Sequence, residues 1–210
     1  MSNAMNHPTA QIQLPVPKRA DARRNHEKLL VAARAVFAEA GASAPLEEVA
    51  ARAGVGVGTL YRNFATRQAL LEAVYVDEVE AIAHAAEELA ELPPWEALAE
   101  WLRRYVGFAA TKRLLMEAIL ASGPASEVLG ASKKAIVDAG TSLLSRAQEA
   151  GIVRTDIQIL DVTRVIGGIA VMASDDPDQT ERMLRLALDG LRYRSYERAS
   201  AVGAAGVRTA

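Results

Sequence analysis

The sequence contains no cysteine, which excludes disulfides, thiolate zinc sites and iron–sulfur clusters. Long apolar runs are also missing: the longest, residues 165–173, has nine residues, against about 18 for a membrane span. Only three histidines are present, and none lies three or four residues from another, so no helical metal pair is available. We expect no metal, no cofactor and no membrane partner. Because no basic segment precedes an apolar stretch, we expect no signal peptide and a cytoplasmic protein.

The sequence has little excess charge of either sign, because the formal net charge is only −2 for 210 residues. That average hides a split. Residues 18–67 carry nine Lys and Arg against five Asp and Glu, a net charge of +4, whereas residues 68–210 have a net charge of −6. A compact basic segment joined to an acidic body is a candidate for binding a polyanion such as nucleic acid.

Convincing strand patterns are absent as well, because apolar residues recur at three- and four-residue steps through most of the chain. The pattern predicts an all-α fold of about nine helices, with a three-helix head on a larger helical body. We expect a disordered arm over residues 1–20 that includes a cloning scar at its start. A head over 21–68, a body over 69–198 and a flexible tail over 199–210 complete the expected organisation.

Several helix boundaries can be predicted from capping residues. Gly41 is expected to end the first helix, and Ser43 to cap the second with Pro45 in its first turn. Thr66 is expected to cap a long helix from residue 67 to about 92. Asp161 and Asp176 are expected to cap the last two helices. Separate helices are expected around residues 95–109 and 114–120.

Motifs for catalysis are missing. There is no Gly-x-Ser-x-Gly and no thiol nucleophile. The glycine run 54–58 superficially matches a dinucleotide fingerprint, but its third glycine comes one residue early and a helix precedes it. We therefore do not expect an enzyme.

The strongest motif is residues 46–64, with the sequence LEEVAARAGVGVGTLYRNF. Two short helices joined by a tight glycine turn are typical of a helix-turn-helix. Gly54 supplies the turn, while Leu60 and Phe64 are expected to point inward. The outward residues include Arg, Asn, Thr and Tyr, which suit base edges and phosphates.

Residues 23–70 resemble the DNA-binding head of the TetR family of regulators. The resemblance is carried by V-A-x-x-A-G-V, by G-T-L-Y-R-N-F and by the following A-L-L. It implies that DNA contacts come from the second helix of the motif and its neighbours. Val57 stands where many members have a polar residue, and Pro45-Leu46 stand where many have hydroxyl residues. The implied DNA-binding residues are Ser43, Val57, Gly58, Thr59, Tyr61, Arg62, Asn63 and Arg67.

By the same resemblance, the body holds an effector pocket and a dimer interface. An aromatic stripe on the helix after Pro94 indicates an apolar or aromatic small molecule. The expected effector-binding residues are Trp101, Tyr105, Phe108, Met116, Leu120, Ile136 and Leu143. The expected interface residues are Gly167, Gly168, Leu184, Leu188 and Leu191.

The favoured function is a ligand-responsive repressor that binds a palindromic operator in double-stranded DNA as a homodimer. One alternative is a constitutive DNA-binding regulator with a vestigial pocket. The other is a helical small-molecule carrier or enzyme without a DNA role. Steep salt dependence of binding to random duplex DNA would separate the first two from the third.

Overall fold

The computed structural model describes residues 20–122, 128–172 and 176–192. These residues contain eight helices, and their one strand-like pairing is an isolated bridge between Val153 and Arg192. The expected tail, and the expected arm except Ala20, lie outside the described residues. The helices are α1 (Ala20–Ala40), α2 (Leu46–Arg52), α3 (Val57–Asn63), α4 (Arg67–Glu88), α5 (Pro94–Ser122), α6 (Val128–Glu149), α7 (Ile159–Met172) and α8 (Pro177–Leu191).

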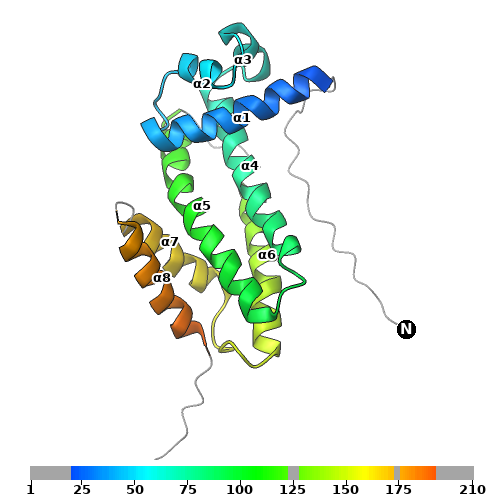
Figure 1. Cartoon of the computed structure of the whole chain (residues 1–210), viewed down its shortest axis with the longest axis vertical. Coiled ribbons are helices and arrows are strands. Elements are labelled where there is room, and N and C mark those ends of the chain that lie inside the picture. Colours follow the sequence, from blue (N-terminus) through cyan, green and yellow to red (C-terminus); the bar gives the residue numbers. More distant parts are fainter. Residues whose placement is uncertain (1–19, 123–127, 173–175, 193–210) are drawn as a thin grey trace, which may run out of the picture.

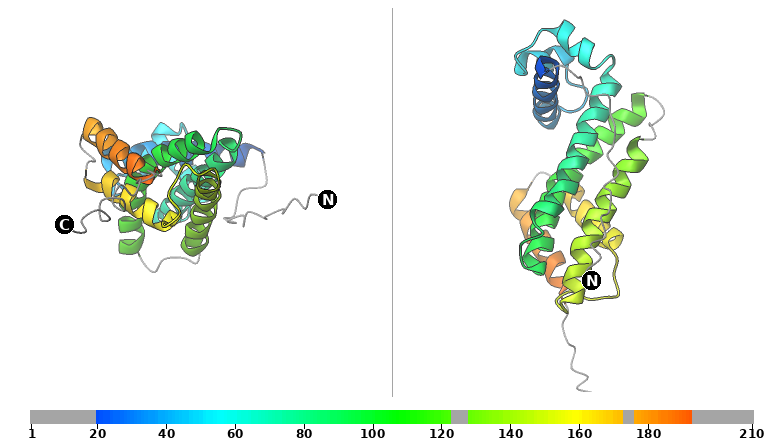
Figure 2. Two further views of the ribbon diagram at one scale, coloured as in Figure 1. Left: turned by 90° about the horizontal axis from the view of Figure 1, so that it is seen from below. Right: turned by 90° about the vertical axis from the view of Figure 1, so that its right-hand side faces the viewer.

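The molecule is elongated, with a small head at one end of a helical body (Figures 1 and 2). Helices α1, α2 and α3 form the head. Helix α4 leaves the head and runs along the body, where it packs against α5 and α6. Helices α7 and α8 lie together beside the far half of the body, and α7 packs on α5. The expected all-α architecture is confirmed.

The head is held by one apolar face of α1. Leu29, Ala33 and Phe37 are almost completely buried, at the three- and four-residue spacing of a helix face. Gly41 ends α1 as expected, with a φ of +79°, a conformation that costs little only for glycine. Gly54 does the same between α2 and α3, with a φ of +68°.

Capping follows the sequence at two helices and departs from it at two others. The Thr66 side chain accepts a hydrogen bond from the backbone N–H of Ala69, and Asp176 accepts one from Gln179. Ser43, however, does not cap α2; Pro45 occupies that position with no side-chain cap, because its extended backbone leads directly into the helix.

The second departure concerns α7, which begins at Ile159 rather than after Asp161. Asp161 therefore lies inside the first turn. Its carboxylate reaches back to accept a hydrogen bond from the backbone N–H of Gln158, at 3.0 Å. Asp161 thus still caps the N-terminus of α7, but it does so from the third position of the helix rather than from the position before the helix.

Helix α5 is one continuous helix of 29 residues, where the sequence indicated two. The polar turn at Thr111, Lys112 and Arg113 interrupts the apolar stripe, but no proline breaks the helix there. Leu115 and Ile119 resume the buried face one turn later. This merger is why the described chain has eight helices rather than about nine.

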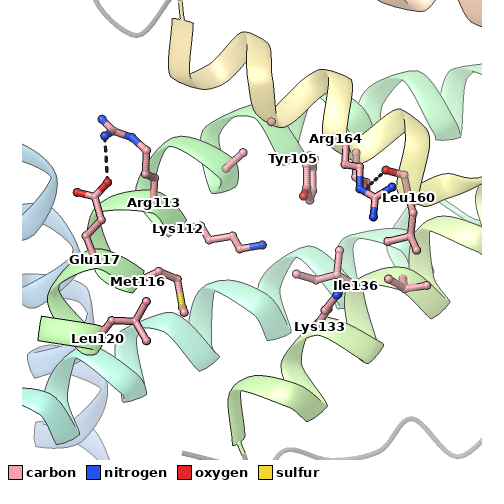
Figure 3. A pocket seen from close by; sticks show the side chains of 14 residues that line it. Tyr105, Lys112, Arg113, Met116, Glu117, Leu120, Lys133, Ile136, Leu160 and Arg164 are labelled. Carbon is pink, nitrogen blue, oxygen red and sulfur yellow. Dashed lines mark hydrogen bonds and ion pairs between the residues drawn. The ribbon is translucent and has the colours of Figure 1, made fainter. Parts of the chain in front are cut away.

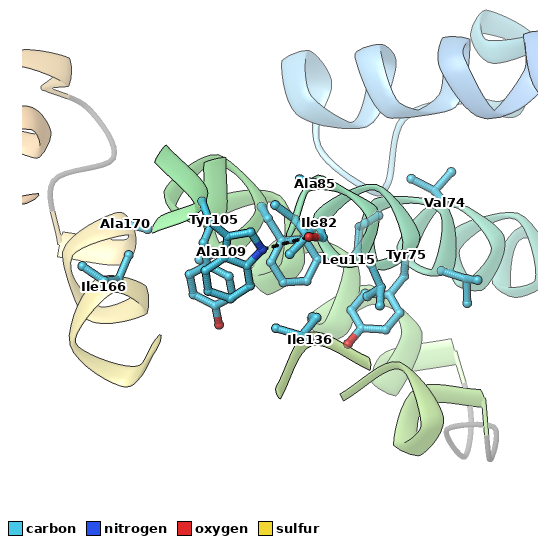
Figure 4. Close-up of a cluster of buried hydrophobic side chains, with 14 of the residues drawn as sticks. Val74, Tyr75, Ile82, Ala85, Tyr105, Ala109, Leu115, Ile136, Ile166 and Ala170 are labelled. Carbon is cyan, nitrogen blue, oxygen red and sulfur yellow. Dashed lines mark hydrogen bonds between the residues drawn. The ribbon is translucent and has the colours of Figure 1, made fainter. Parts of the chain in front are cut away.

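Part of the body core is drawn in Figure 4, with Ile82 of α4, Tyr105 of α5 and Ile166 of α7 among its labelled residues. Trp101 is fully buried in this core. Its indole Nε1 donates a 2.9 Å hydrogen bond to the backbone carbonyl of Ile82, which joins α5 to α4. Gly140 of α6 lies against this tryptophan. A Cβ at Gly140 would come within 2.6 Å of both Trp101 and Ile159, so the absence of a side chain sets how closely α5, α6 and α7 approach.

We expect Gly140→Ala to lower the free energy of unfolding by about 1–3 kcal/mol, the usual cost of overpacking a core. Urea unfolding followed by circular dichroism measures it. Gly107→Ala in α5 is the control, since nothing lies within 4 Å of its added Cβ. The control should be neutral or stabilising, because alanine favours a helix. Equal stability of the two variants would contradict the close approach at Gly140.

Candidate nucleic-acid interface and effector cavity

Helices α2 and α3 form the helix-turn-helix that the sequence predicts. In the turn, the backbone N–H of Val55 donates to the carbonyl of Ala50 at 3.0 Å, and Gly54 takes up the left-handed conformation. Leu60 and Phe64 are buried and anchor α3 to the rest of the head. The opposite face of α3 is therefore presented to solvent.

That outward face consists of Val57, Gly58, Tyr61 and Arg62, all of which are exposed. Tyr61 is 47% exposed, so about half of its side chain is open to solvent. Nothing lies within 4 Å of a Cβ built on Gly58, so its surface is open. These four residues form the surface that a DNA groove could meet, and we call them the α3 face.

Thr59 and Asn63 are partly buried and contact their own helix. The Asn63 side-chain amide donates to the carbonyl of Thr59 at 2.8 Å. The Thr59 hydroxyl accepts a 3.1 Å hydrogen bond from the guanidinium of Arg62. Thr59, Arg62 and Asn63 therefore all form hydrogen bonds within α3, and of these three only Arg62 is also exposed.

Arg67 holds the loop between α1 and α2. Its guanidinium Nη1 donates to the backbone carbonyls of Ala42 and Ala44, at 3.1 and 2.7 Å. This loop carries Ser43, which is exposed and was also expected to contact DNA. The Arg67 guanidinium therefore stabilises the conformation of this loop. The sequence pattern did not indicate this structural role.

A cavity of about 420 Å³ opens in the body between α5, α6 and α7 (Figure 3). That volume is typical of small-molecule sites, which span about 300–1,000 Å³. Four of the expected effector residues line it. They are Tyr105, Met116, Leu120 and Ile136.

The other three expected effector residues are core residues rather than cavity-wall residues. Trp101, Phe108 and Leu143 are at most 3% exposed and do not line the cavity. Trp101 stacks on Tyr105 with ring centroids 5.5 Å apart, and Phe108 packs on the same tyrosine. The aromatic stripe spans more of the helix surface than the cavity does, so only Tyr105 faces the cavity. Trp101 and Phe108 pack behind Tyr105 and support it.

The cavity wall is also charged, which the sequence-based expectation missed. Lys112, Arg113, Lys133 and Arg164 line it, together with one carboxylate, Glu117. A signal for Lys112 exists in the sequence. Residues 105, 109, 112 and 116 share one helix face at four- and three-residue steps, so the lysine had to face wherever Tyr105 faces.

Lys112 lies in an electrostatically unfavourable place for a cation. Burial lowers the pKa of Lys112, and the positive charge of nearby Lys133 lowers that pKa further. Burial also raises the pKa of Tyr105, while a hydrogen bond with Thr163 opposes the rise. The cavity thus combines neutral phenol with an ammonium that lacks full solvation.

The expected interface residues divide between three environments. Leu184 and Leu188 are buried within the chain itself, and Leu191 is half-buried. Gly167 lines the cavity, and Gly168 is exposed. The leucine stripe of α8 therefore joins the core and is not available as a free surface, because α8 needs that face to pack on α7.

A different apolar surface remains on these two helices. Nine large apolar side chains of the described residues are exposed, and four of them lie on α7 and α8. We call these four the α7–α8 patch. They are Val165, Val171, Met172 and Leu186.

A chain of contacts runs from the cavity to the head. Tyr105 packs on Phe108, and Phe108 packs on Tyr75 of α4, with ring centroids 5.5 and 6.4 Å apart. Nearby on α4, Asp77 and Glu78 both form ion pairs with Arg34 of α1. Burial raises the pKa of Glu78, and the Arg34 charge opposes the rise. Cavity and head therefore share α4 as their common neighbour.

Comparison with known proteins places this arrangement in a family. Residues 29–74 match the model of bacterial regulatory proteins of the tetR family, and residues 93–193 match that of the C-terminal domain of SbtR-like transcriptional regulators. A TetR transcriptional regulator from Streptomyces coelicolor is 45% identical, with a TM-score of 0.70, over 80% of this chain and 98% of that one. This chain belongs to the TetR family of transcriptional regulators.

A second TetR regulator, from Mycobacterium vanbaalenii, is 37% identical, with a TM-score of 0.69, over 84% of this chain and all of that one. A gamma-butyrolactone receptor is 23% identical, with a TM-score of 0.57, over 85% of this chain and 92% of the receptor chain. At this level of identity the likeness shows the fold alone. A comparison with curated proteins found no match. The predicted membership of the TetR family and the predicted role as a transcriptional regulator are confirmed.

Two features are absent from the described residues. No group of three or more His, Asp or Glu side chains is arranged to hold a metal ion. None of the helices is both long and apolar enough to cross a membrane.

We expect Arg67→Ala to lower the free energy of unfolding by about 1–3 kcal/mol, because two partly buried carbonyls lose a charged donor. Urea unfolding measures the loss. Arg62→Ala is the control, since that guanidinium is exposed and contacts only its own helix. Its stability should stay within about 0.5 kcal/mol of the wild type. A destabilised Arg62→Ala with an unaffected Arg67→Ala would reverse the two assignments.

Proposed function

We propose that this protein is a repressor that binds a palindromic DNA operator as a homodimer and releases it when a small molecule fills the cavity between α5, α6 and α7. The observation that carries the DNA role is the α3 face, which is open to solvent on a helix whose other side is anchored by Leu60. It lies in the segment of the chain with net positive charge. Positive potential attracts phosphates, and the exposed side chains can then read base edges.

Among the reading residues, Tyr61 and Arg62 are the strongest candidates, because they are exposed as they stand. Val57 offers methyl groups to a thymine, and Gly58 allows close approach of the backbone. Thr59 and Arg62 would first have to break the hydrogen bond between them, and Asn63 its bond to the Thr59 carbonyl. For Arg67 we propose a positioning role, in which it shapes the loop that holds Ser43 toward a phosphate.

A dimer supplies the second reading helix that a rare operator requires. One recognition helix contacts few base pairs, whereas a two-fold pair contacts two half-sites whose centres lie about 34–36 Å apart or a multiple of that distance. We place the interface on the α7–α8 patch. Scattered apolar side chains are normal on a surface, but four of the nine exposed ones lie on α7 and α8, which pack against each other, and we propose that a partner covers them.

Helix α4 is the proposed route of control. A ligand that displaces Tyr105 presses on Phe108 and through it on Tyr75 of α4. The ion pairs of Arg34 with α4 then carry a tilt of α4 to the head. Tenfold release of DNA requires a ligand to prefer the released conformation by about 1.4 kcal/mol.

The experiment that tests the DNA role is salt-dependent binding to random duplex DNA, followed by selection of an operator from a random pool. Affinity should fall steeply with salt, because phosphate contacts release counterions. A protein that binds no duplex even at low salt would instead be a helical carrier or enzyme. No observation among the described residues favours that reading over the regulator, and we propose no catalytic activity.

We expect Arg62→Ala to reduce the preference for the selected operator over random DNA by about 1–3 kcal/mol, the value of one good base contact. Fluorescence anisotropy with labelled duplexes measures both affinities. Arg104→Ala is the control, because Arg104 lies in the body and pairs with Glu88. Unchanged preference in Arg62→Ala would show that α3 does not read bases through this side chain.

We expect Leu186→Glu to convert a dimer into a helical monomer that has lost operator affinity, because a charge would be buried in the α7–α8 patch. Sedimentation velocity at micromolar concentration measures the mass, and circular dichroism confirms the helices. Leu92→Glu, an exposed apolar residue between α4 and α5, is the control and should remain dimeric. A wild-type protein that sediments as a monomer would refute the proposed assembly.

A further inference from the structure

Three cations from three different helices face the cavity. Lys112 comes from α5, Lys133 from α6 and Arg164 from α7, and all three project between the helices in Figure 3. They are far apart in the sequence, so this convergence exists only in the folded chain. It sets the electrostatic character of the site.

No carboxylate among the described residues forms an ion pair with any of the three. The one carboxylate of the wall, Glu117, is already paired with Arg113 at 3.2 Å. Next to Lys133, by contrast, Lys134 points elsewhere and pairs with Asp138. The two neighbouring lysines therefore differ in their partners. Lys134 has a carboxylate partner, whereas Lys133, which faces the cavity, has none among the described residues.

This uncompensated charge is unfavourable without a ligand. Lys112 is partly buried, and both its burial and the charge of Lys133 lower its pKa. An anion between the two ammonium groups would offset both effects at once, since it supplies the missing counter-charge in a partly desolvated place. A neutral ligand would leave the repulsion in place.

Apart from Thr163 and the Arg113–Glu117 ion pair, the rest of the wall is mostly apolar. Met116, Leu120 and Ile136 line the cavity on the same helices as Lys112 and Lys133, and Tyr105 contributes its ring. Such a surface gains from contact with hydrocarbon but offers few hydrogen bonds. The cavity wall therefore offers both cationic and apolar side chains to one ligand.

We propose that the effector is an amphipathic organic anion, with its acid group held among Lys112, Lys133 and Arg164 and its hydrocarbon part against Met116, Leu120 and Ile136. This inference rests on the proposed function of the cavity as the effector site. It corrects the expectation of a purely apolar or aromatic ligand. The three cations would accept either a carboxylate or a phosphate monoester, and the choice of probes distinguishes these.

The test is isothermal titration calorimetry on the full chain without DNA. Octanoate and 1-naphthoate are compared with their uncharged amides, and octyl phosphate provides the second kind of acid group. At least one anion should bind tenfold or more tightly than its uncharged counterpart, which corresponds to about 1.4 kcal/mol. A preference for octyl phosphate over octanoate would assign a phosphate monoester, and the reverse order a carboxylate.

Two variants on neighbouring residues supply the matched comparison. Lys133→Gln should weaken anion binding at least fivefold and leave amide binding unchanged, whereas Lys134→Gln should change neither. Lys112→Met should have the larger effect of the cavity variants. Because Lys133 and Arg164 are exposed, Lys133→Gln and Arg164→Gln still decide the question if Lys112→Met fails to fold.

The inference is overturned if amides bind as tightly as anions, if Lys133→Gln and Arg164→Gln bind anions like the wild type, or if no anion binds below about 1 mM. The proposed function is judged separately, by operator binding of the wild type without ligand. Failure of anion binding with intact DNA binding counts against the ligand class alone. Loss of DNA binding with intact anion binding counts against the repressor.

Discussion

The architecture depends on α4 belonging to two cores at once. Leu70 and Leu71, near its start, are fully buried close to the head, and Val79 and Ile82 are buried in the body. A helix that is apolar around most of its circumference cannot lie on a surface, so it must be enclosed by other elements. Helices α1, α5 and α6 all pack against it. Because the enclosure is tight, α4 cannot shift at one end without repacking at the other.

This shared helix gives a physical basis for communication between the ends of the molecule. Packed cores resist continuous deformation, so a ligand that wedges into the body favours one packing arrangement over another. Aromatic rings connect the cavity wall to α4 through Tyr105, Phe108 and Tyr75. At the other end, Arg34 ties α1 to two carboxylates of α4. The apolar contacts resist compression, and the ion pairs keep the head from sliding.

The cavity shows how charge and packing share one helix. In α5 the buried face is interrupted by a polar turn, and the structure places that turn at a hollow rather than at a break. Lys112 can follow Tyr105 on the same face because the space beside it is not filled by protein. The Lys112 ammonium lies over the Phe108 ring, 6.0 Å from the ring centre. A site that is both aromatic and cationic results from this juxtaposition.

The head could be predicted almost entirely from local sequence. Short-range signals determine it: helical spacing of apolar residues in α1, positive-φ glycines at Gly41 and Gly54, and a threonine cap at Thr66. The body was predicted less well. The polar turn around Lys112 predicts the end of a helix, yet α5 continues through it. The leucine stripe of α8 predicts a dimer interface, yet Leu184 and Leu188 are buried in the chain's own core. An apolar stripe shows that a face is covered but not by which element.

By itself, the sequence determined the helices, the turn chemistry and the motif that carries the family, because each depends on residues within a few positions of one another. Only the tertiary structure decided which aromatic residues support the cavity and which line it, and that Arg67 holds a loop through Ala42 and Ala44. It also decided that cations from α5, α6 and α7 meet around one hollow. Those outcomes depend on how distant helices cross, and such crossings are settled by the packing of all their faces together.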